Sequence, residues 1–439
     1  MSSLSGWGRY PRIRGVERLS EDLESITAGA TLTRGLGRSY GDSSLPPEGG
    51  RAVAGSRLAD RLLAFDAETG ILRAEAGLSL RALNEVFLAR GFSAPVVPGT
   101  QFVTLGGMVA SDVHGKNHHV AGCIGEYVRS LRMRVPDGRI LDVTDEGERD
   151  LFRATLGGMG LTGHILEVEL ALERIPSPWI WQETEPVPNL DVLVDVLRAA
   201  GRDWPFTASW ADCAKSGPTL GRGFVTRGRW ATPDEARREA PRMRERLAVP
   251  FTMPDALICR PTVRIFNSLW HRLHARPTSG LAHPQPFFYP LDGIAEWNRL
   301  YGPSGFSQYQ CVLPLEDDGR AYRRLFDVFV RHCGASPVTV IKDCGAEGRG
   351  MLSFPKPGIS IALDVPRRGA RTQALVDRMN EIVIEAGGRV YLTKDALTRR
   401  EHFLAMEPRF AAWNEIRRKW DPDGVLRSAQ SVRLFGDAP

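Results

Sequence analysis

The chain has 439 residues, of which 42% are hydrophobic and 25% charged, and a formal net charge of +5. This composition is typical of a soluble globular protein, and the length predicts more than one hydrophobic core. Because the arginines are scattered, anionic small molecules are favoured over nucleic acid as ligands. The six cysteines form no CxxC pair and no zinc-ligand spacing, which indicates a reducing compartment without a disulfide framework.

The sequence also gives an expectation for the cellular location. Residues 1–7 lack the charged and apolar regions of a signal peptide, and no long apolar stretch suited to a membrane span occurs in the sequence. We therefore expect a cytoplasmic protein. A peripheral position on the inner face of the membrane is left open by the basic charge.

Residues 34–42, with the sequence RGLGRSYGD, form the first unusual segment. Three glycines allow tight turns, and two arginines with free backbone amides can bind an anion. The segment is not a Rossmann motif, since Tyr40 stands where a third glycine would be, and no Gly-Lys-Ser/Thr makes it a Walker loop. A phosphate-binding loop and an ordinary glycine-rich loop both remain open.

Two further segments follow along the chain. Residues 78–91 have apolar side chains at helical spacing and end at Gly91, which predicts a helix. Residues 98–119 join a Pro-Gly turn to a run of small residues and then to the polar cluster HGKNHH. Small residues let the backbone approach a large flat ligand, and free amides can bind phosphate oxygens. This segment predicts a site for a phosphate-bearing aromatic cofactor.

The rest of the chain reads as strands and helices in two parts. Strands are expected at 128–135 and 163–172, and the prolines at 176 and 178 mark a boundary. Strands and two longer helices are expected after it, and a helical segment from about residue 398. Residues 253–274 mix apolar and basic side chains; a membrane-surface helix, a cover over a lipid-binding cleft and an ordinary packed element are all open readings.

Polar residues in the second part are candidates for a site. Gln308 and Gln310 alternate in an expected strand, so their amides point the same way and can bind sugar hydroxyls. Lys342 follows an apolar run, where a charge is unusual. Lys394 and His114 are candidates for handling a proton, since a lysine near apolar surface and another cation has a lowered pKa. His114 and His118 lie in a glycine-containing loop without the glutamate of an HExxH motif, so we predict no metal.

Together these motifs resemble the vanillyl-alcohol-oxidase/PCMH-type FAD-binding flavoproteins. The resemblance runs from residues 6–9 through both loops to 161–163, 296–303, 308–310 and 391–395. It implies an α+β fold, with a two-part PCMH-type FAD-binding domain at 1–175, a separate antiparallel-sheet substrate domain at 176–397, and a helical return to the FAD domain at 398–439. Since Arg38, not histidine, precedes Ser39, non-covalent FAD is expected.

The resemblance also implies an activity. It points to oxidation of the 2′-hydroxyl of polyprenylphosphoryl-β-D-ribose to the 2′-keto form, by hydride transfer to flavin N5. A separate NAD(P)H-dependent keto-reductase would complete the epimerisation to arabinose. The implied substrate is thus a lipid-phosphate-linked sugar, with peripheral membrane contact as a further option. A soluble aldonolactone, alditol or antibiotic-pathway sugar oxidase of the same fold remains open, as does a carrier-binding protein without turnover.

Site residues follow from the same resemblance. Lys394 and His114 are implied as catalytic. Relatives carry asparagine and cysteine at the positions of Ser360 and Ala362, which leaves the exact substrate open. The implied substrate contacts are Gln308, Gln310, Lys342, Tyr289, Trp210, Ser360 and Ala362. The implied cofactor contacts are Arg34, Gly35, Leu36, Gly37, Arg38, Ser39, Tyr40, Pro98, Gly99, Thr100, Thr104, Gly106, Gly107, Ser111, His114, Lys116, Asn117, Ile165 and Tyr391.

Overall fold

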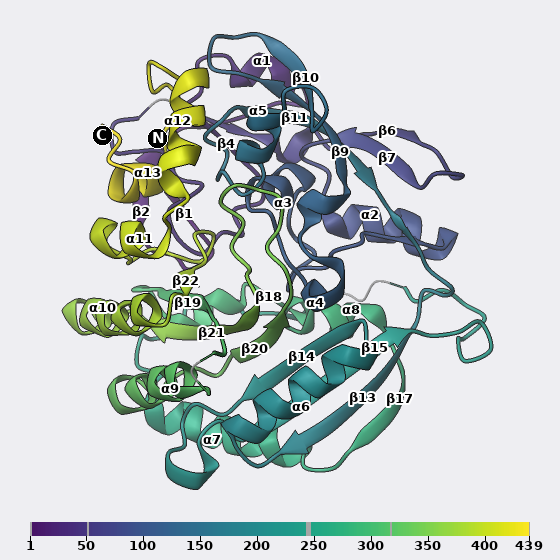
Figure 1. Cartoon of the computed structure of the whole chain (residues 1–439), viewed down its shortest axis with the longest axis vertical. Helices are drawn as coiled ribbons and strands as arrows, with labels where there is room; N and C mark the ends of the chain where they lie inside the picture. The colour runs from purple at the N-terminus through teal and green to yellow at the C-terminus, as the bar shows by residue number, and fades with distance from the viewer. Residues whose placement is uncertain (1, 51, 243–246, 317, 439) are drawn as a thin grey trace.

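The structure is a computed structural model that describes residues 2–50, 52–242, 247–316 and 318–438. Residues 1 and 439, the outer ends of the predicted domains, lie outside the described residues. Helices and sheets are mixed along the chain, so the predicted α+β class is confirmed. The two chain ends lie on the same side of the molecule (Figure 1).

The first part of the chain builds around a five-stranded sheet. Its strand order is β10-β9-β11-β7-β6, and all neighbours are antiparallel. A three-stranded parallel sheet lies beside it, in the order β3-β5-β4. The strands of these sheets are β3 (Glu17–Leu19), β4 (Leu32–Arg34), β5 (Val53–Gly55), β6 (Leu62–Phe65), β7 (Ile71–Glu75), β9 (Val128–Arg134), β10 (Ile140–Thr144) and β11 (His164–Ala171).

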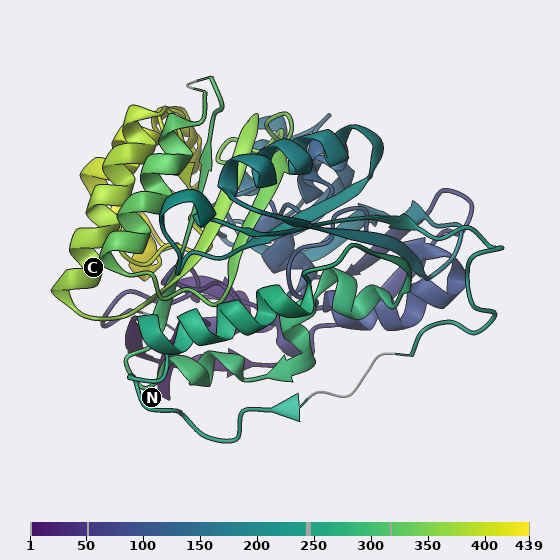
Figure 2. The same ribbon diagram turned by 90° about the horizontal axis from the view of Figure 1, so that it is seen from below.

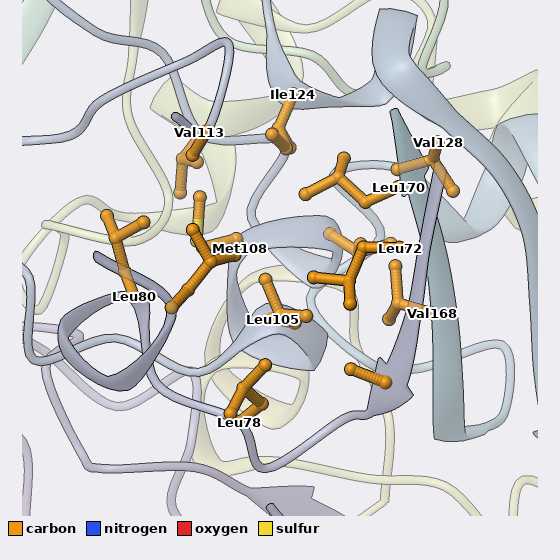
Figure 3. Close-up of a cluster of buried hydrophobic side chains, with 14 of the residues drawn as sticks. Leu72, Leu78, Leu80, Leu105, Met108, Val113, Ile124, Val128, Val168 and Leu170 are labelled. Atoms are coloured by element: carbon orange, nitrogen blue, oxygen red, sulfur yellow. The ribbon is translucent and has the colours of Figure 1, made fainter. Parts of the chain in front are cut away.

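Short helices cover this sheet and enclose its core. The expected helix at 78–91 is α2 (Leu80–Phe87) with a further 3-10 turn, and it ends at Gly91 in the left-handed region, as predicted. The expected strands at 128–135 and 163–172 are β9 and β11. Figure 3 shows Leu105 and Met108 of α3 packed among the leucine and valine side chains of β7 and β11. The other helices of this part are α1 (Leu23–Thr27), α3 (Leu105–Ala110), α4 (His118–Ala121) and α5 (Arg149–Thr155).

The chain leaves the first part between Arg174 and Ile180 and enters an eight-stranded antiparallel sheet. Its order is β17-β13-β15-β14-β20-β21-β19-β22. Side chains alternate between its two faces, and the face that carries Tyr309, Cys311, Ile361 and Leu363 forms one core with the covering helices. The strands are β13 (Ile180–Val187), β14 (Phe206–Ala211), β15 (Gly223–Trp230), β17 (Thr278–Ala282), β19 (Phe306–Leu313), β20 (Thr339–Cys344), β21 (Gly358–Pro366) and β22 (Arg389–Val390).

Four helices of 13 to 16 residues accompany this sheet, where we expected two. The apolar repeat of Leu190, Leu193 and Leu197 is buried, and its spacing is the sequence signal for the first of the four. Figure 2 shows α6 (Leu190–Asp203), α9 (Arg320–His332) and α10 (Ala370–Glu385) on one face and α7 (Arg260–Leu273) on the other. The part of this second face that α7 leaves free, around Gln310, meets His114 of the first part of the chain and can line a site.

The last helices pack back against the first part of the chain (Figure 1). The indole of Trp413 is fully buried and donates to the carbonyl of Ala154 at 2.8 Å. Arg433 forms a bidentate ion pair with Asp42. The remaining elements are α11 (Arg400–Met406), α12 (Phe410–Trp420), α13 (Ala429–Leu434), α8 (Pro284–Phe288), β1 (Ser2–Ser5), β2 (Arg12–Gly15), β8 (Phe92–Ser93), β12 (Glu173–Arg174), β16 (Leu247–Ala248) and β18 (Ile294–Ala295).

Candidate active site

The free face of the eight-stranded sheet carries a row of polar side chains. Gln310 on β19 lies opposite Ala362 on β21, and Lys342 on β20 lies opposite Ser360. Residues directly opposite each other in an antiparallel pair point to the same face. The prediction that Gln308 and Gln310 point the same way is therefore confirmed, and both share a face with Lys342, Ser360 and Ala362.

Gln310 joins this sheet to the loop that contains His114. Its amide nitrogen lies 3.0 Å from the hydroxyl of Ser360 and 3.1 Å from Nε2 of His114. Because an amide N–H donates, Nε2 of His114 accepts and the ring proton sits on Nδ1. Burial, and then the charges of Lys342, His118 and Lys394, hold the pKa of His114 well below 6.5. His114 is thus a neutral imidazole held in one orientation.

Lys394 lies in the same region and can exchange a proton near neutral pH. Burial, and then the charge of Lys342, lower its pKa to about 7, while the nearby Asp364 raises it. Its Nζ lies 3.8 Å from the ring centroid of Tyr40, and within the described chain it has no ion-pair partner. A lysine in such surroundings can act as a general base.

Two further lysines add to this cationic centre. Burial and the charge of Lys342 lower the pKa of Lys116 to about 7, and its ammonium donates to the carbonyl of Phe287. Burial also lowers the pKa of Lys342. Since the charge of Lys342 lowers the pKa of His114, His118, Lys116 and Lys394, it lies at the centre of the group.

Asp364 is a site residue that the sequence reasoning missed. Tyr301 donates to one of its carboxylate oxygens at 2.5 Å and Gln308 to the other at 2.7 Å. Burial raises the pKa of this carboxyl to about 6, although both hydrogen bonds lower it. The signal was present in the sequence, because Asp364 alternates with Ser360 and Ala362 in the expected strand and so belongs to the same face.

The glycine-rich loop at 34–42 contacts the other two cofactor segments. A Cβ atom on Gly35 would lie 2.4 Å from the hydroxyl of Thr104, and one on Gly41 would lie 1.7 Å from the carbonyl of Asp395. The amide of Tyr40 donates to the carbonyl of Thr393 at 2.9 Å. These glycines are needed because the loop backbone lies against the side chain of Thr104 at Gly35 and against the backbone of Asp395 at Gly41.

The second cofactor segment is held from both sides. Asp292 accepts from the hydroxyl of Thr100 at 2.7 Å and from the amide of Gln101 at 2.8 Å. Thr104 caps α3 by accepting from the amide of Gly107. A Cβ atom on Gly99 would meet nothing within 4 Å, so the loop borders open space at that point.

The segment at 111–117 and Tyr391 close the same region. The hydroxyl of Tyr391 donates to the carbonyl of Ser111 at 3.1 Å, and its ring lies 5.1 Å from that of His114. The amide nitrogen of Asn117 donates to the carbonyl of Pro95. Gly106 packs against Ala76, and the buried Ile165 lies on β11 next to α3.

Whether these segments fit FAD can be judged from their buried polar atoms that lack a hydrogen-bond partner within the protein. Among the described residues, both amide atoms of Gln101, Nδ1 of His114 and Oδ1 of Asn117 are buried and have no hydrogen-bond partner. Buried polar groups in folded proteins nearly always have partners. FAD carries donors and acceptors along its whole length, so the residues present fit this group.

Three other residues predicted to contact a ligand form hydrogen bonds to neighbours within the protein. The guanidinium of Arg34 donates to Ser44 and to the carbonyl of Ser5, and so shapes its loop. The hydroxyl of Tyr289 accepts from Asn84 at 3.0 Å. The indole of Trp210 donates to the carbonyl of Pro337. Trp210 lies two strands away from Ala362, on the same face of the sheet. The structure brings together Lys394, His114, Gln308, Gln310, Lys342, Ser360 and Ala362 and places Trp210 at the margin of this group, whereas Tyr289 packs in the core of the first part of the chain.

The histidines next to His114 serve the fold. His118 accepts from the amide of Gly345 at 3.1 Å, and burial, then Lys342 and His119, lower its pKa to about 4. Nε2 of His119 donates to the carbonyl of Trp204 at 2.9 Å. In the part of the chain that the structure describes, no three His, Cys, Asp or Glu side chains are grouped so that they could hold a metal ion.

Comparison with known proteins identifies the family of this chain. Residues 27–144 match the family model described as "FAD binding domain". The chain is 34% identical to the decaprenylphosphoryl-beta-D-ribose oxidase of Mycolicibacterium smegmatis, over 98% of this chain and 97% of that protein. It is also 32% identical to an uncharacterised protein of Streptomyces coelicolor, over 81% of this chain and all of that protein.

A more distant match covers only a quarter of the chain. A putative D-arabinono-1,4-lactone oxidase of Neurospora crassa is 29% identical over 25% of this chain and 19% of its own length. The similarity to lactone oxidases is therefore confined to one part of the chain, whereas the similarity to the ribose oxidase extends over both sheets.

Proposed function

Because the chain belongs to the family of the decaprenylphosphoryl-β-D-ribose oxidases, we propose that it oxidises the 2′-hydroxyl of polyprenylphosphoryl-β-D-ribose to the 2′-keto sugar. The chain is an FAD-dependent oxidoreductase. The observation that carries the choice of substrate is the row of Gln308, Gln310, Ser360 and Lys342, which faces His114 and Lys394 beside the cofactor loops. Amides and hydroxyls suit a sugar, and the partly exposed ammonium of Lys342 suits its phosphate.

Lys394, Gln310 and His114 have distinct roles in the proposed reaction. Lys394 in its neutral form accepts the proton of the sugar hydroxyl, because its pKa of about 7 makes both of its forms available. Gln310 holds His114 in one orientation, so that the neutral ring borders the sugar. FAD, when bound, supplies the acceptor for the hydride of the alcohol carbon. Burial of the site keeps water from competing for these groups.

The arrangement of the chain supports a two-part cofactor domain. In this proposal residues 1–175 and 398–439 hold FAD, and residues 176–397 bind the substrate. The predicted contacts within 34–40, 98–107 and 111–117, together with Ile165 and Tyr391, would hold the cofactor, and the contacts between these segments support that grouping. The absence of a histidine before Ser39 supports a dissociable cofactor.

The proposal includes partners and a location. A keto sugar on a lipid phosphate needs a reduction to complete an epimerisation, so a separate NAD(P)H-dependent keto-reductase would take the product. Among the described residues no helix is long and apolar enough to cross a membrane. We place the enzyme in the cytoplasm, peripheral to the inner face of the membrane where a lipid-linked substrate resides.

An anaerobic absorbance spectrum before and after adding farnesylphosphoryl-ribose tests the function. Bleaching of the flavin band near about 450 nm is expected, since the oxidised alcohol reduces the flavin. Lys394→Met, with FAD bound to the same extent, should bleach at least about a hundredfold more slowly, as expected on loss of a general base. Bleaching by a soluble lactone or alditol but not by the lipid-linked sugar would refute the proposed substrate.

A further inference from the structure

An exposed apolar face lies on α7, which packs on the same side of the eight-stranded sheet as the candidate site and beside it. Of its fourteen residues only Val263 and Asn267 are buried. Ile265 is 64% exposed, Leu269 56% and Leu273 76%. At 100° per residue these three side chains lie within about one quarter of the helix circumference. We call Ile265, Leu269 and Leu273 the apolar face of α7.

The charge around this face has one sign. No Asp or Glu occurs between Asp255 and Asp292, whereas arginines stand at 260, 264, 272 and 276. Arg260, Arg264 and Arg272 line a groove along the exposed side of α7 together with Ile265 and Leu269. Arginines beside an exposed apolar stripe are typical of a helix that lies in the interface of a bilayer.

A continuous row of aromatic rings joins this helix to the sheet that carries the candidate site. Trp210 stacks on Phe224 with centroids 5.6 Å apart, and Phe224 stacks on His274 at 4.3 Å. His274 contacts Trp270 at 4.5 Å, and Trp270 lies parallel to Phe266 at 6.1 Å. Trp210 shares its sheet face with Ala362 and Gln310. The row therefore runs from the margin of the site to the helix surface.

The anchoring of α7 makes this connection rigid. Asn267 is fully buried and donates to the carboxylate of Asp212 at 2.9 Å. Arg222 pairs with the same carboxylate and reaches the hydroxyl of Ser268. Asp212 thus ties α7 to the sheet from beneath, and the apolar face is left pointing outward.

We propose that the apolar face of α7 and its arginines dock on an anionic lipid bilayer, so that the site opens at the membrane surface from which the substrate comes. This inference rests on the proposed function for its purpose, but the binding itself needs no substrate. The apolar side chains enter the interface, and the arginines bind lipid phosphates. The aromatic row then fixes the distance between the bilayer and the sugar site.

Sedimentation of the FAD-loaded enzyme with vesicles tests the docking. We expect binding to vesicles of phosphatidylcholine mixed with phosphatidylglycerol, and much weaker binding to phosphatidylcholine alone. Arg264→Gln with Arg272→Gln should weaken binding about 25-fold, at about fivefold for each arginine. Leu269→Asp should abolish it, and Leu404→Asp, which changes an exposed leucine on α11, is the control that should bind like the wild type.

The outcomes separate this proposal from the proposed function. All variants should be bleached by farnesylphosphoryl-ribose in detergent at the wild-type rate, because neither the arginines nor Leu269 touch the site. Failure of bleaching in every protein would refute the function and leave the vesicle result standing. Equal binding to neutral and anionic vesicles, or binding by Leu269→Asp, would overturn the docking proposal. Dimerisation of the wild type that Leu269→Asp abolishes would assign the face to a second copy and overturn it as well.

Discussion

Replacing Asp364 by asparagine should stabilise the folded protein at neutral pH, although Asp364 lies in the candidate site. Burial raises the pKa of its carboxyl from 3.8 to about 6, so the folded protein binds this proton more tightly than the unfolded chain does. The ionised carboxylate therefore costs stability above about pH 6, and the cost is relieved as the pH falls towards 3.8. A difference of about two pKa units corresponds to about 3 kcal/mol. For a chain of this length that is roughly 3 °C in melting temperature.

The assay is thermal unfolding of FAD-loaded protein, followed by circular dichroism at a series of pH values. Asp364→Asn should melt above the wild type at neutral pH, and the difference should roughly halve by about pH 5, because the wild-type carboxylate then takes up a proton. The same variant should shift the acidic limb of flavin reduction to lower pH, since the charge of Asp364 raises the pKa of Lys394.

Asp395 is the matched comparison, because it is equally buried and adjacent in sequence to Lys394. Burial raises the pKa of its carboxyl, but the charge of Arg433 and the amides of Leu397 and Thr398 outweigh this and lower it. A lowered pKa stabilises the fold above the ordinary carboxyl pKa, and this contribution is lost as the pH falls. Asp395→Asn should therefore destabilise the protein at neutral pH. A destabilised Asp364→Asn, or the same sign for both variants, would contradict the reasoning.

Three other predictions concern the cofactor and the proton. Flavin reduction by the sugar should accelerate as the pH rises above about 7, because neutral Lys394 forms there and the bound phosphates raise its pKa further; a rate that shows no such rise at any higher pH would rule out Lys394 as the base. Gly99→Ala should fold like the wild type but bind FAD at least about tenfold more weakly, since a methyl group would enter the open space at that loop. Gly293→Ala is the control, because a Cβ atom there also meets nothing within 4 Å. Equal FAD affinities of the two variants would place the cofactor elsewhere. Acid precipitation should release all the flavin into the supernatant, and flavin retained in the pellet would mean a covalent bond.

Local patterns in the sequence predicted the elements that carry the site, but not the contacts between them. The alternation of Gln308 with Gln310 fixed their common face, because side chains in a strand have a period of two. The same rule applied to residues 358–364 would have found Asp364. Its partner Tyr301 could not be found in this way, since the two residues are 63 apart and meet only when a 3-10 turn packs against the sheet.

The hydrogen bonds that hold the cofactor loop could not be predicted from local sequence either. Thr100 and Asp292 are 192 residues apart, and nothing local to either indicates that they form a hydrogen bond. The spacing of the loop glycines indicated close approach, but the approaching atoms, such as the carbonyl of Asp395 beside Gly41, depend on how the two parts of the chain dock. Periodicity thus determines which way a side chain points, and tertiary packing determines what it meets.

The charge of the site itself indicates what it binds. Lys116, Lys342 and Lys394 lie close together and are only partly exposed, and within the described residues none of them forms an ion pair. A buried charge without a partner is costly, and this cost appears as the lowered pKa of each lysine. An anion between these ammonium groups would raise all three pKa values and return stability to the fold. The ligands of the proposed reaction, a dinucleotide with a pyrophosphate and a sugar on a lipid phosphate, both bring that anion.

Binding of either ligand should therefore be accompanied by proton uptake near neutral pH, and calorimetry in buffers of different ionisation enthalpy would measure this uptake. A lactone or an alditol carries no phosphate and should bind without that uptake, so the number of protons taken up distinguishes the two classes of substrate independently of turnover.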